Sequence, residues 1–424
     1  MILGEDLLID GRIRGIPVDL TCEDATDIIG LRPSVGETAF PVLTVSRSAF
    51  VANARAMFAY ARAADVDLAP HAKTPMAPEL CADLVESGAW GLTVADARQA
   101  RVLLESGFRR IVVANQIGGL RSAERFGRML GHYRNAEILV FVDSIAALES
   151  VAAAGREAEL EVGVLIEVGG ARSGARDIDT IREIAARAAA TPMIELAGVS
   201  AYEGASALAD PQATREAIGR LHELARQAFD LVRQMRPAGR LILSSGGSSF
   251  FDLVVEDLAG LVRADSNARL LLRSGAIYFH DHGVYKRGLA AMDHRGGFEP
   301  AGLGRAVDAF TPALRLWAEI LSRPEPGLAI CGMGMRDVSF DQDLPCPLSL
   351  WRDGASTDVS STARVRKLND QHAFIDIGEA ADWQVGDIIE FGISHPCTCI
   401  DRWRSIFELD DNGAVRRILP TFFG

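Results

Sequence analysis

Residues 137–168 read EILVFVDSIAALESVAAAGREAELEVGVLIEV and contain the pattern that decides the fold. A β-rich run at 137–143 is followed by an Ala/Arg/Glu-rich stretch with helical periodicity, and a second β-rich run follows at 161–168. Strands that alternate with helices in this way form parallel sheets. Such runs occur at 67–73, 90–96, 110–116, 137–143, 161–168, 194–203, 241–247 and 268–276. Eight strand-helix units predict an α/β protein with a closed (β/α)8 barrel.

The pattern changes after about residue 285 to spaced β-type segments separated by turn signals. These segments are 314–321, 363–368, 374–377 and 387–391. We therefore expect a barrel over 40–285 and a C-terminal β-rich domain over 286–424. Within the first of these, 41–45 has the composition of a lead-in strand before a helical run at 46–64. Residues 1–39 are poor in strand signals, and we expect them to pack on the β-rich domain.

The composition indicates a soluble catalyst of small-molecule chemistry. The chain has 424 residues and a formal net charge of -13, and an acidic surface repels the phosphates of nucleic acids and of anionic membranes. The first residues, MILGED, lack a basic region followed by an apolar one, and no apolar run is long enough to cross a bilayer. We therefore expect a cytoplasmic protein that binds neither nucleic acid nor membrane. The six scattered cysteines do not form a disulfide framework.

In a (β/α)8 barrel, chemistry takes place on the loops that follow the C-terminal ends of the strands. The polar residues that end the predicted strands are Lys73, Gln116, Asp143, Arg172, Tyr202, Ser245 and Arg273. Lys73, within PHAKTP at 70–75, would point its amine into the mouth of the barrel. Between lysine and arginine, only lysine forms a Schiff base with a carbonyl compound, so Lys73 is the candidate for covalent catalysis. A solvated lysine at a strand end is the alternative.

Residues 243–249, LSSGGSS, follow the seventh predicted strand. Barrels often bind phosphate at this place through bare backbone amides and a helix N-terminus. Gly246 and Gly247 would let an anion approach the backbone closely. Most Ser-Gly-Gly-Ser strings are simple turns, and only the position after strand seven favours a phosphate site here.

The most informative spacing in the C-terminal half is His395-Pro396-Cys397. In an extended segment, side chains i and i+2 share one face and can hold one ion. Imidazole and thiolate are a zinc-like pair. Two ligands are fewer than the three of most catalytic zinc sites, so a buried structural pair is the alternative. Cys399 would lie too far along an extended strand to coordinate the same ion, and we do not include it as a ligand.

Taken together, these motifs resemble the D-serine dehydratase and D-threonine aldolase family, whose fold is related to that of alanine racemase. The resemblance rests on PHAKT at 70–74, the glycines at 246–247, RSG at 273–275 with Tyr278 and Asp281, and SHPCT at 394–398 with Asp401 and Trp403. It extends from about residue 40 to the end of the chain. It implies a barrel that binds pyridoxal 5'-phosphate (PLP) as a Schiff base of Lys73, followed by a β-domain.

The resemblance also implies roles for individual residues. The implied PLP contacts are Lys73, Arg172, Tyr202, Ser245, Gly246, Gly247, Ser248, Arg273, Gly275 and Tyr278. Lys73, Tyr202 and Arg172 are the implied catalytic residues. His395 and Cys397 are the implied ligands of Zn²⁺ or another divalent metal. His372 resembles a histidine that precedes the metal motif, and its role as a ligand, as a neighbour of the ligands or as a fold residue stays open.

The implied activity is that of a PLP- and metal-dependent D-amino-acid ammonia-lyase, which converts D-serine or another D-3-hydroxy amino acid to a 2-oxo acid and ammonia. A D-threonine-type aldolase, which releases glycine and an aldehyde, is the alternative. Cys397 favours the lyase, because the aldolase branch typically has aspartate at this position. A non-catalytic PLP-binding protein is a third hypothesis, and the long β-domain argues against it. The resemblance further implies a homodimer.

Overall fold

The computed structural model describes residues 11–20, 27–299 and 302–423. Eight parallel strands form a barrel in the spatial order β2-β9-β8-β7-β6-β5-β4-β3. Their bounds are β2 (Asp67–Leu68), β3 (Leu92–Val94), β4 (Arg110–Val113), β5 (Glu137–Val142), β6 (Val162–Val168), β7 (Ile194–Ala201), β8 (Leu241–Ser245) and β9 (Ala268–Leu272). A bridge between His71 and Thr93 joins the chain after β2 to β3 and closes the ring. The predicted barrel with a C-terminal β-rich domain is confirmed.

The barrel strands are apolar on both faces because each face packs against a different layer. In β5, Leu139 and Phe141 belong to the core inside the barrel, whereas Ile138, Val140 and Val142 pack toward the outer helices. Successive side chains of a strand point to opposite faces, so both faces need apolar residues. This is why residues 138–142 of β5 are a continuous apolar run in the sequence.

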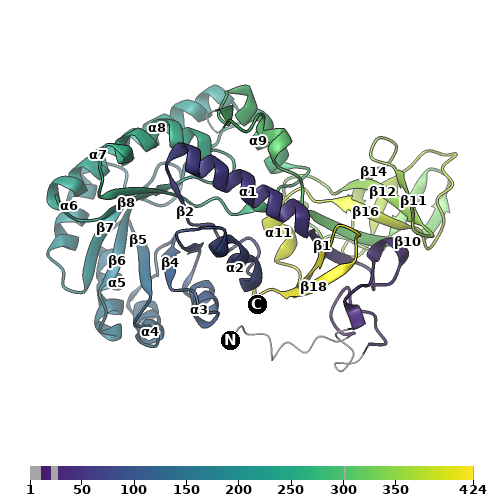
Figure 1. Cartoon of the computed structure of the whole chain (residues 1–424), viewed down its shortest axis with the longest axis horizontal. Helices are drawn as coiled ribbons and strands as arrows, with labels where there is room; N and C mark the ends of the chain where they lie inside the picture. The colour runs from purple at the N-terminus through teal and green to yellow at the C-terminus, as the bar shows by residue number, and fades with distance from the viewer. Residues whose placement is uncertain (1–10, 21–26, 300–301, 424) are drawn as a thin grey trace.

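Helices cover the outside of the barrel, as Figure 1 shows for α4 to α8 around β5 to β8. The helices are α1 (Arg47–Ala64), α2 (Pro78–Glu86), α3 (Ala97–Glu105), α4 (Leu120–Gly131), α5 (Ile145–Ala158), α6 (Ile178–Ala189), α7 (Pro211–Met235), α8 (Phe251–Arg263), α9 (Val284–His294), α10 (Ala306–Ala309) and α11 (Pro396–Ile400). Ser144 caps α5 and Asp177 caps α6 through side-chain hydrogen bonds, which help to set where each helix begins. Within the described residues, no helix combines the length and apolarity that crossing a membrane requires.

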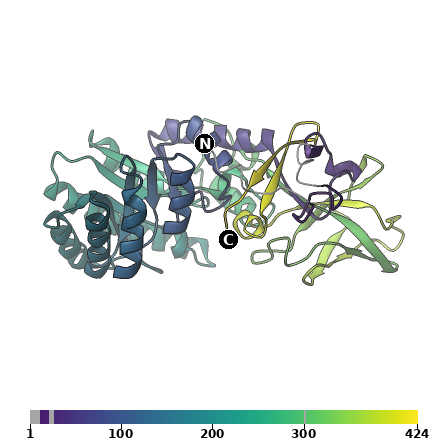
Figure 2. The same ribbon diagram turned by 90° about the horizontal axis from the view of Figure 1, so that it is seen from below.

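A second sheet, largely antiparallel and ten-stranded, lies beside the barrel (Figure 2). Its strands are β1 (Val42–Ser46), β10 (Leu314–Glu325), β11 (Leu328–Cys331), β12 (Cys346–Arg352), β13 (Ala355–Asp358), β14 (Arg364–Leu368), β15 (Ala373–Asp376), β16 (Ile388–Gly392), β17 (Ser405–Leu409) and β18 (Val415–Pro420). Strand β1 pairs with β10 and β17 rather than with the barrel. The segment we grouped with the barrel at 40–285 therefore begins with a strand of the second sheet.

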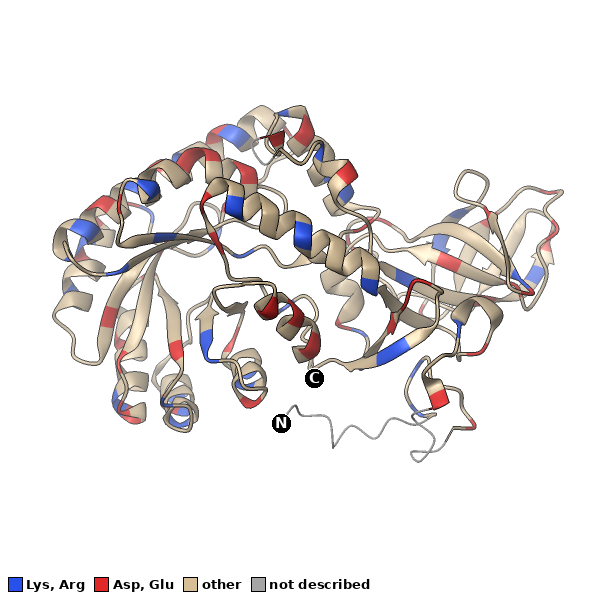
Figure 3. Ribbon diagram, viewed as in Figure 1, with Lys and Arg blue, Asp and Glu red and all other residues tan. Residues whose placement is uncertain are grey.

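The described part of the N-terminal segment packs on this second sheet. Ile16 and Ile28 are fully buried in a cluster with Val42, Trp317 and Phe407. The remaining residues of the 1–39 segment, 1–10 and 21–26, lie outside the described residues. Acidic and basic residues are interspersed along the outer helices (Figure 3), where several form ion pairs such as Arg226 with Glu223.

Candidate active site at the C-terminal ends of the barrel strands

A cavity of about 390 Å³ lies at the C-terminal ends of the barrel strands. Its lining residues are His71, Lys73, Ala95, Ala114, Asn115, Phe141, Arg172, Ser173, Tyr202, Gly246, Gly247 and Arg273. They come from the ends of all eight strands, or from the loops that follow them. The size is within the range of small-molecule and cofactor sites, and the location is that of active sites in (β/α)8 barrels.

Lys73 is the lysine of this cavity. The chain contains only three lysines, Lys73, Lys286 and Lys367. Lys286 is exposed on α9, and Lys367 lies over the Phe374 ring of the second sheet. Among the described residues, Lys73 is thus the only lysine that lines the cavity. Lys73 is therefore the only described side chain at this cavity whose amine could form a covalent bond with a ligand.

Arg273 is a buried cation at the base of the cavity. Its guanidinium donates hydrogen bonds to Ser244 Oγ at 2.5 Å and to the carbonyl oxygen of Ala201 at 2.7 Å, and it lies over the Phe141 ring at 5.2 Å. Burial lowers the pKa of Arg273 to about 10, while the nearby carboxylate of Glu203 opposes this shift. Arg273 therefore stays charged at neutral pH and places a fixed positive charge in the cavity.

Arg172 and Tyr202 form a second polar group at the cavity wall. The Arg172 guanidinium lies 4.9 Å from the centre of the Tyr202 ring and 3.8 Å from the Glu167 carboxylate. Burial, followed by the charge of Glu203, raises the pKa of Tyr202, so its hydroxyl keeps its proton at neutral pH. Burial lowers the pKa of His71 well below its usual value, and the positive charge of Lys73 lowers it further, so His71 is a neutral group there.

The loop after β8 is held by a buried carboxylate. Glu203 is fully buried and accepts hydrogen bonds from Ser245 Oγ at 2.8 Å, Gly246 N at 3.1 Å and Gly247 N at 2.5 Å. The sequence analysis expected the two glycine amides to be bare, and this expectation is wrong because they already have an acceptor. Gly246 has a φ of +94°, and a Cβ there would lie 2.6 Å from the Leu272 side chain. Glycine is therefore required at 246 for backbone conformation and space.

Replacing Glu203 with alanine is expected to lower the free energy of unfolding by about 1–3 kcal/mol, because it leaves buried donors without an acceptor. Urea denaturation measures this change, which arises because the loop at 245–247 loses the carboxylate that accepts its hydrogen bonds. Glu216→Ala, which removes an exposed carboxylate from α7, is the matched control. An unchanged unfolding midpoint for Glu203→Ala would show that the carboxylate does not hold the loop.

Four of the predicted cofactor contacts are not among the residues that line the cavity. Ser245 and Ser248 use their hydroxyls within the protein, toward Glu203 and toward the Ile277 amide. A Cβ on Gly275 would lie 2.4 Å from the His71 carbonyl oxygen, so Gly275 permits close packing beside the segment between β2 and Lys73. Tyr278 is buried, and within the described chain its hydroxyl has no hydrogen-bond partner. The structure gathers the other six, Lys73, Arg172, Tyr202, Gly246, Gly247 and Arg273, at one cavity.

The segment with His395 and Cys397 is not an extended strand, as the sequence analysis assumed. Pro396 begins the short helix α11, and His395 is its N-cap residue, with an extended backbone at φ -154° and ψ 109°. Proline at the first helical position is well suited to start a helix. Cys397 Sγ lies 3.3 Å from Thr74 Oγ1, and Thr74 directly follows Lys73. The second domain thus brings His395 and Cys397 next to the chain segment that carries the cavity lysine.

His395 is hydrogen-bonded on one side of its ring. Its Nδ1 atom lies 2.7 Å from Asp341 Oδ2 and 3.1 Å from Thr398 Oγ1. Burial lowers the pKa of His395, but the hydrogen bonds and charges of Cys397 and Asp341 outweigh burial and raise the pKa to about 9. Burial likewise raises the pKa of Asp341, and the hydrogen bonds from Thr398 and His395 outweigh it and lower the pKa.

Neither Cys399 nor His372 joins this pair. Cys399 is fully buried, its Sγ lies 3.9 Å from the Asp337 carbonyl oxygen, and burial raises the pKa of its thiol to about 12. His372 is exposed in the turn between β14 and β15. In the described ranges no group of three or more His, Cys, Asp and Glu side chains is arranged to hold a metal ion. His395 and Cys397 are thus two donors without a third protein ligand in these ranges.

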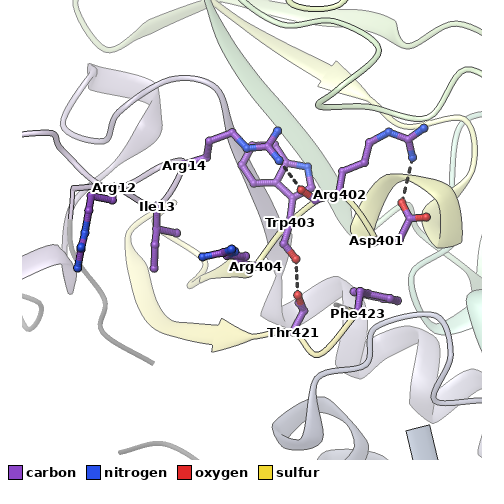
Figure 4. Close-up of a pocket in the computed structure, with 9 residues that line it drawn as sticks. All are labelled: Arg12, Ile13, Arg14, Asp401, Arg402, Trp403, Arg404, Thr421 and Phe423. Carbon is purple, nitrogen blue, oxygen red and sulfur yellow. Dashed lines mark hydrogen bonds and ion pairs between the residues drawn. The ribbon is translucent and has the colours of Figure 1, made fainter. Parts of the chain in front are cut away.

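A different cavity of about 390 Å³ lies behind α11, between the N-terminal segment and the C-terminal strands (Figure 4). Arg14 lies over the Trp403 ring at 4.5 Å, forms an ion pair with Asp337 and donates to the Arg402 carbonyl oxygen. Trp403 in turn donates from Nε1 to the Asp337 carbonyl oxygen at 2.8 Å. These contacts hold the chain just after α11 in place, and none of the described residues that line this cavity is a lysine.

Comparison with known proteins agrees with this architecture. The family described as alanine racemase, N-terminal domain, matches residues 45–260, which is about half of the chain and includes the strands from β2 to β8. The chain belongs to this alanine racemase barrel family. A further family, described as a putative serine dehydratase domain, matches residues 313–409 and therefore most of the second sheet and α11.

Several relatives of this alanine racemase-type barrel protein are known. A D-threonine aldolase from an Arthrobacter species is 26% identical over 362 residues, which cover 84% of this chain and 85% of that protein. The crystal structure of a D-threonine aldolase from Filomicrobium marinum superimposes with a TM-score of 0.76 at 21% identity and covers 93% of this chain and 97% of that one.

A D-threo-3-hydroxyaspartate dehydratase has a similar structure in two variant forms. In one variant a cysteine is replaced by alanine, and this variant is described as metal-free. Its structure superimposes with a TM-score of 0.69 at 21% identity and covers 93% of this chain and 100% of that one. In the other, a histidine two positions earlier is replaced by alanine; the TM-score is 0.71 at 20% identity over 95% and 99% of the two chains. His395 and Cys397 of this barrel protein have the same spacing.

Sequence reasoning missed several polar residues of the site. Glu203 lies inside the motif around Tyr202, but its contacts are with residues more than forty positions later. Glu167 accepts a hydrogen bond from Gln116 at 2.7 Å. The only sequence signal for a role of Glu167 in the site was its position near the end of a predicted strand. Apart from its charge, nothing in the sequence indicated that Asp341 belongs to the site. Its hydrogen bond with His395 joins two residues that are more than fifty positions apart in the chain.

Proposed function

We propose that this chain is a PLP-dependent lyase of D-amino acids and that Lys73 holds the cofactor. The observation that carries the proposal is that Lys73, one of only three lysines in the chain, lines the cavity at the C-terminal ends of the barrel strands. The aldolase and dehydratase relatives, whose names specify D-amino acids, support the same activity class.

The cavity residues fit PLP by their chemistry. Lys73 offers the amine that binds an aldehyde, and Arg172 and Arg273 add positive charge suited to an anionic cofactor and to a substrate carboxylate. A Cβ on Gly247 would lie 2.9 Å from the Tyr202 ring, so the glycine keeps this wall free of a side chain. When bound, PLP withdraws electrons from the Cα of an amino acid and so acidifies its Cα proton.

Lys73, Arg172 and Tyr202 would have different roles toward a bound substrate. Lys73 Nζ, as the amine at the cavity, accepts the Cα proton. It reaches the substrate from one side, so only one enantiomer presents its Cα proton to Nζ, and the relatives' names point to the D-enantiomer. Arg172 and Tyr202 line the cavity together, and the Arg172 guanidinium lies 4.9 Å from the centre of the Tyr202 ring, so each side chain restricts the position of the other.

We further propose that His395 and Cys397 hold a zinc ion. Imidazole and thiolate suit zinc, and the contact between Cys397 and Thr74 places the pair beside the residue that follows Lys73. The spacing of the replaced histidine and cysteine in the dehydratase variants, one of them metal-free, supports this role. A bound zinc ion would polarise the β-hydroxyl oxygen of a substrate. With two protein donors, the remaining positions stay open to water and substrate.

The proposed reaction is the dehydration of D-serine or another D-3-hydroxy amino acid to a 2-oxo acid and ammonia. The Cys397 thiolate favours it, since thiolate selects zinc over the harder ions that carboxylates bind. Aldol cleavage is the second candidate, because an aldolase matches 84% of this chain. In it, the same metal ion would assist deprotonation of the β-hydroxyl group while the bond between Cα and Cβ breaks, which releases glycine and an aldehyde.

A product assay separates these candidates. The PLP- and zinc-loaded protein is incubated with D-serine, D-threonine and D-threo-3-hydroxyaspartate, with the L-enantiomers as controls. Dehydration of D-threonine yields 2-oxobutanoate and ammonia, whereas aldol cleavage yields glycine and acetaldehyde. We expect turnover of the D-enantiomers with 2-oxo acid as the product. Equal rates on D- and L-serine would contradict the D-specificity, and no turnover of any substrate would favour a non-catalytic PLP-binding protein.

We also propose that the protein is a homodimer. The proposal comes from the family resemblance. Multi-angle light scattering of the PLP-loaded protein should give twice the chain mass of 45.6 kDa. A mass equal to that of one chain would contradict the dimer.

A further inference from the structure

We propose that Asp341 is a positioning residue that holds the His395 ring so that Nε2 faces a divalent metal ion. This inference rests on the proposed metal role of His395 and Cys397, and it adds to it a residue that does not itself bind the ion. Metal-binding histidines commonly donate their second ring N–H to a carboxylate, which fixes the tautomer and the ring orientation.

The contact between the two side chains has the required geometry. Asp341 Oδ2 lies 2.7 Å from His395 Nδ1, the distance of a charge-assisted hydrogen bond. This contact occupies Nδ1, and Thr398 Oγ1 lies on the same side of the ring at 3.1 Å. Nε2 is therefore the only ring nitrogen left for a metal ion.

Asp341 is itself held in place by the helix that carries Cys397. Thr398 donates from Oγ1 to Asp341 Oδ1 at 2.5 Å, so each carboxylate oxygen has a separate partner on the segment 395–398. Although the Asp341 side chain is 39% exposed, these two bonds restrict its rotation. Because the carboxylate is held by a second partner, it can fix the orientation of the His395 imidazole.

The backbone of the same loop also docks against the start of α11. The His395 amide donates to Ser339 Oγ at 3.2 Å, and Ser339 Oγ lies 3.2 Å from Ser394 Oγ. Ser394 Oγ donates to the carbonyl oxygen of Asp343 at 2.6 Å. The loop at 339–343 thus contacts both the backbone and the ring of His395, and Asp341 provides its contact with the ring.

The arrangement favours an orienting role over direct coordination. Across the described ranges, no three His, Cys, Asp and Glu side chains converge as metal ligands, so Asp341, His395 and Cys397 do not form a three-ligand site. Asp341 instead contacts the ring nitrogen opposite to the one proposed for the metal. Loss of Asp341 should therefore weaken metal binding without removing it.

The test measures zinc affinity of the PLP-loaded protein by competition with a chromophoric chelator. Asp341→Ala is expected to weaken zinc binding about 10–100-fold, the usual effect of losing a partner of a metal ligand. Asp341→Asn should recover part of this loss, because an amide oxygen still accepts a hydrogen bond from Nδ1–H. Asp343→Asn is the matched control, since Asp343 is on the same loop, is exposed and pairs with Arg287 instead. Its zinc affinity should equal that of the parent.

A second measurement reports the ring directly and does not depend on activity. In the zinc-loaded parent, ¹⁵N NMR of labelled histidine should show His395 with a proton on Nδ1 and the metal on Nε2, and Asp341→Ala should lose this uniform state. Circular dichroism and the PLP absorbance verify that the variant is folded. If Asp341→Ala is unfolded, Thr398→Val replaces it, with a smaller expected loss because it removes only the support of the carboxylate.

The outcomes for the inference and for the proposed function are distinguishable. If His395→Ala binds zinc as tightly as the parent, the proposed metal site itself is wrong. If His395→Ala loses zinc while Asp341→Ala keeps the parental affinity and the same His395 tautomer, only the role of Asp341 is wrong. If Asp341→Ala abolishes zinc binding as completely as His395→Ala does, Asp341 is a ligand rather than a positioning residue, which also overturns the inference.

Discussion

Replacing Lys73 with alanine is expected to reduce the release of ammonia from D-serine by at least about 10²-fold, because the variant loses the amine proposed to accept the Cα proton. The same change removes the covalent link to PLP, so the visible absorbance of the protein should shift to that of free or loosely bound cofactor. Steady-state assays and absorbance spectra measure both effects.

The two other lysines provide matched controls for this prediction. Lys286→Ala and Lys367→Ala remove exposed amines away from the cavity and should keep both activity and covalently bound PLP. If Lys73→Ala retains the parental spectrum and one of the control variants loses it, the cofactor is held elsewhere and the proposed site is wrong.

Removal of the metal is expected to have the second large effect. Chelation, or the change His395→Ala, should lower turnover of D-3-hydroxy amino acids at least about 10²-fold, because a metal ion contributes several kcal/mol of charge stabilisation at a polarised oxygen. The PLP absorbance should remain nearly unchanged, since the lysine comes from the barrel and the proposed ligands from α11. Added zinc should restore the chelated parent but not His395→Ala.

The control for metal removal also resolves the open role of His372. His372 is exposed in the turn between β14 and β15, so His372→Ala should keep parental activity and zinc content. Full turnover of D-serine by the metal-free parent would show that His395 and Cys397 are a packed structural pair and not a metal site.

The barrel was predictable from the sequence because its signals are local. Strands such as β5 and β6 consist mainly of apolar residues buried on both faces, and Ser144 and Asp177 cap the helices that follow them. The repetition of this unit determines the architecture without knowledge of long-range contacts. For the same reason the position of Lys73 at the mouth of the barrel could be predicted.

The second sheet was harder to predict because several of its strands have weak local patterns. All four residues of β13 (Ala355–Asp358) are exposed, so the strand is defined by its pairing with β12 and not by alternating hydrophobicity. Strand β1 pairs with β10, about 270 residues later in the chain, and nothing in its own sequence specifies that partner. The helical start at Pro396 was also missed, although proline at N1 was its signal.

The candidate site was predictable at strand ends and not at contacts between distant segments. Lys73, Arg172, Tyr202 and Arg273 lie within five residues after the C-terminal ends of barrel strands, and the fold brings these ends together. The hydrogen bonds between the buried Glu203 carboxylate and the loop at 245–247 could not be predicted, because only the tertiary structure brings these two segments together. The neighbourhood of Asp341 and His395 likewise depends on how a loop packs against α11, which one sequence does not specify.

The central claim is that Lys73 binds PLP covalently in the barrel cavity. The most direct test is borohydride reduction of the PLP-loaded protein, followed by proteolysis and mass spectrometry of the peptides. Because the chain has only three lysines, each carrier peptide is distinguishable. We predict that the pyridoxyl group is found on Lys73 alone and in a stoichiometry near one per chain. A pyridoxyl group on Lys286 or Lys367, or the absence of any reduced adduct, would contradict the account.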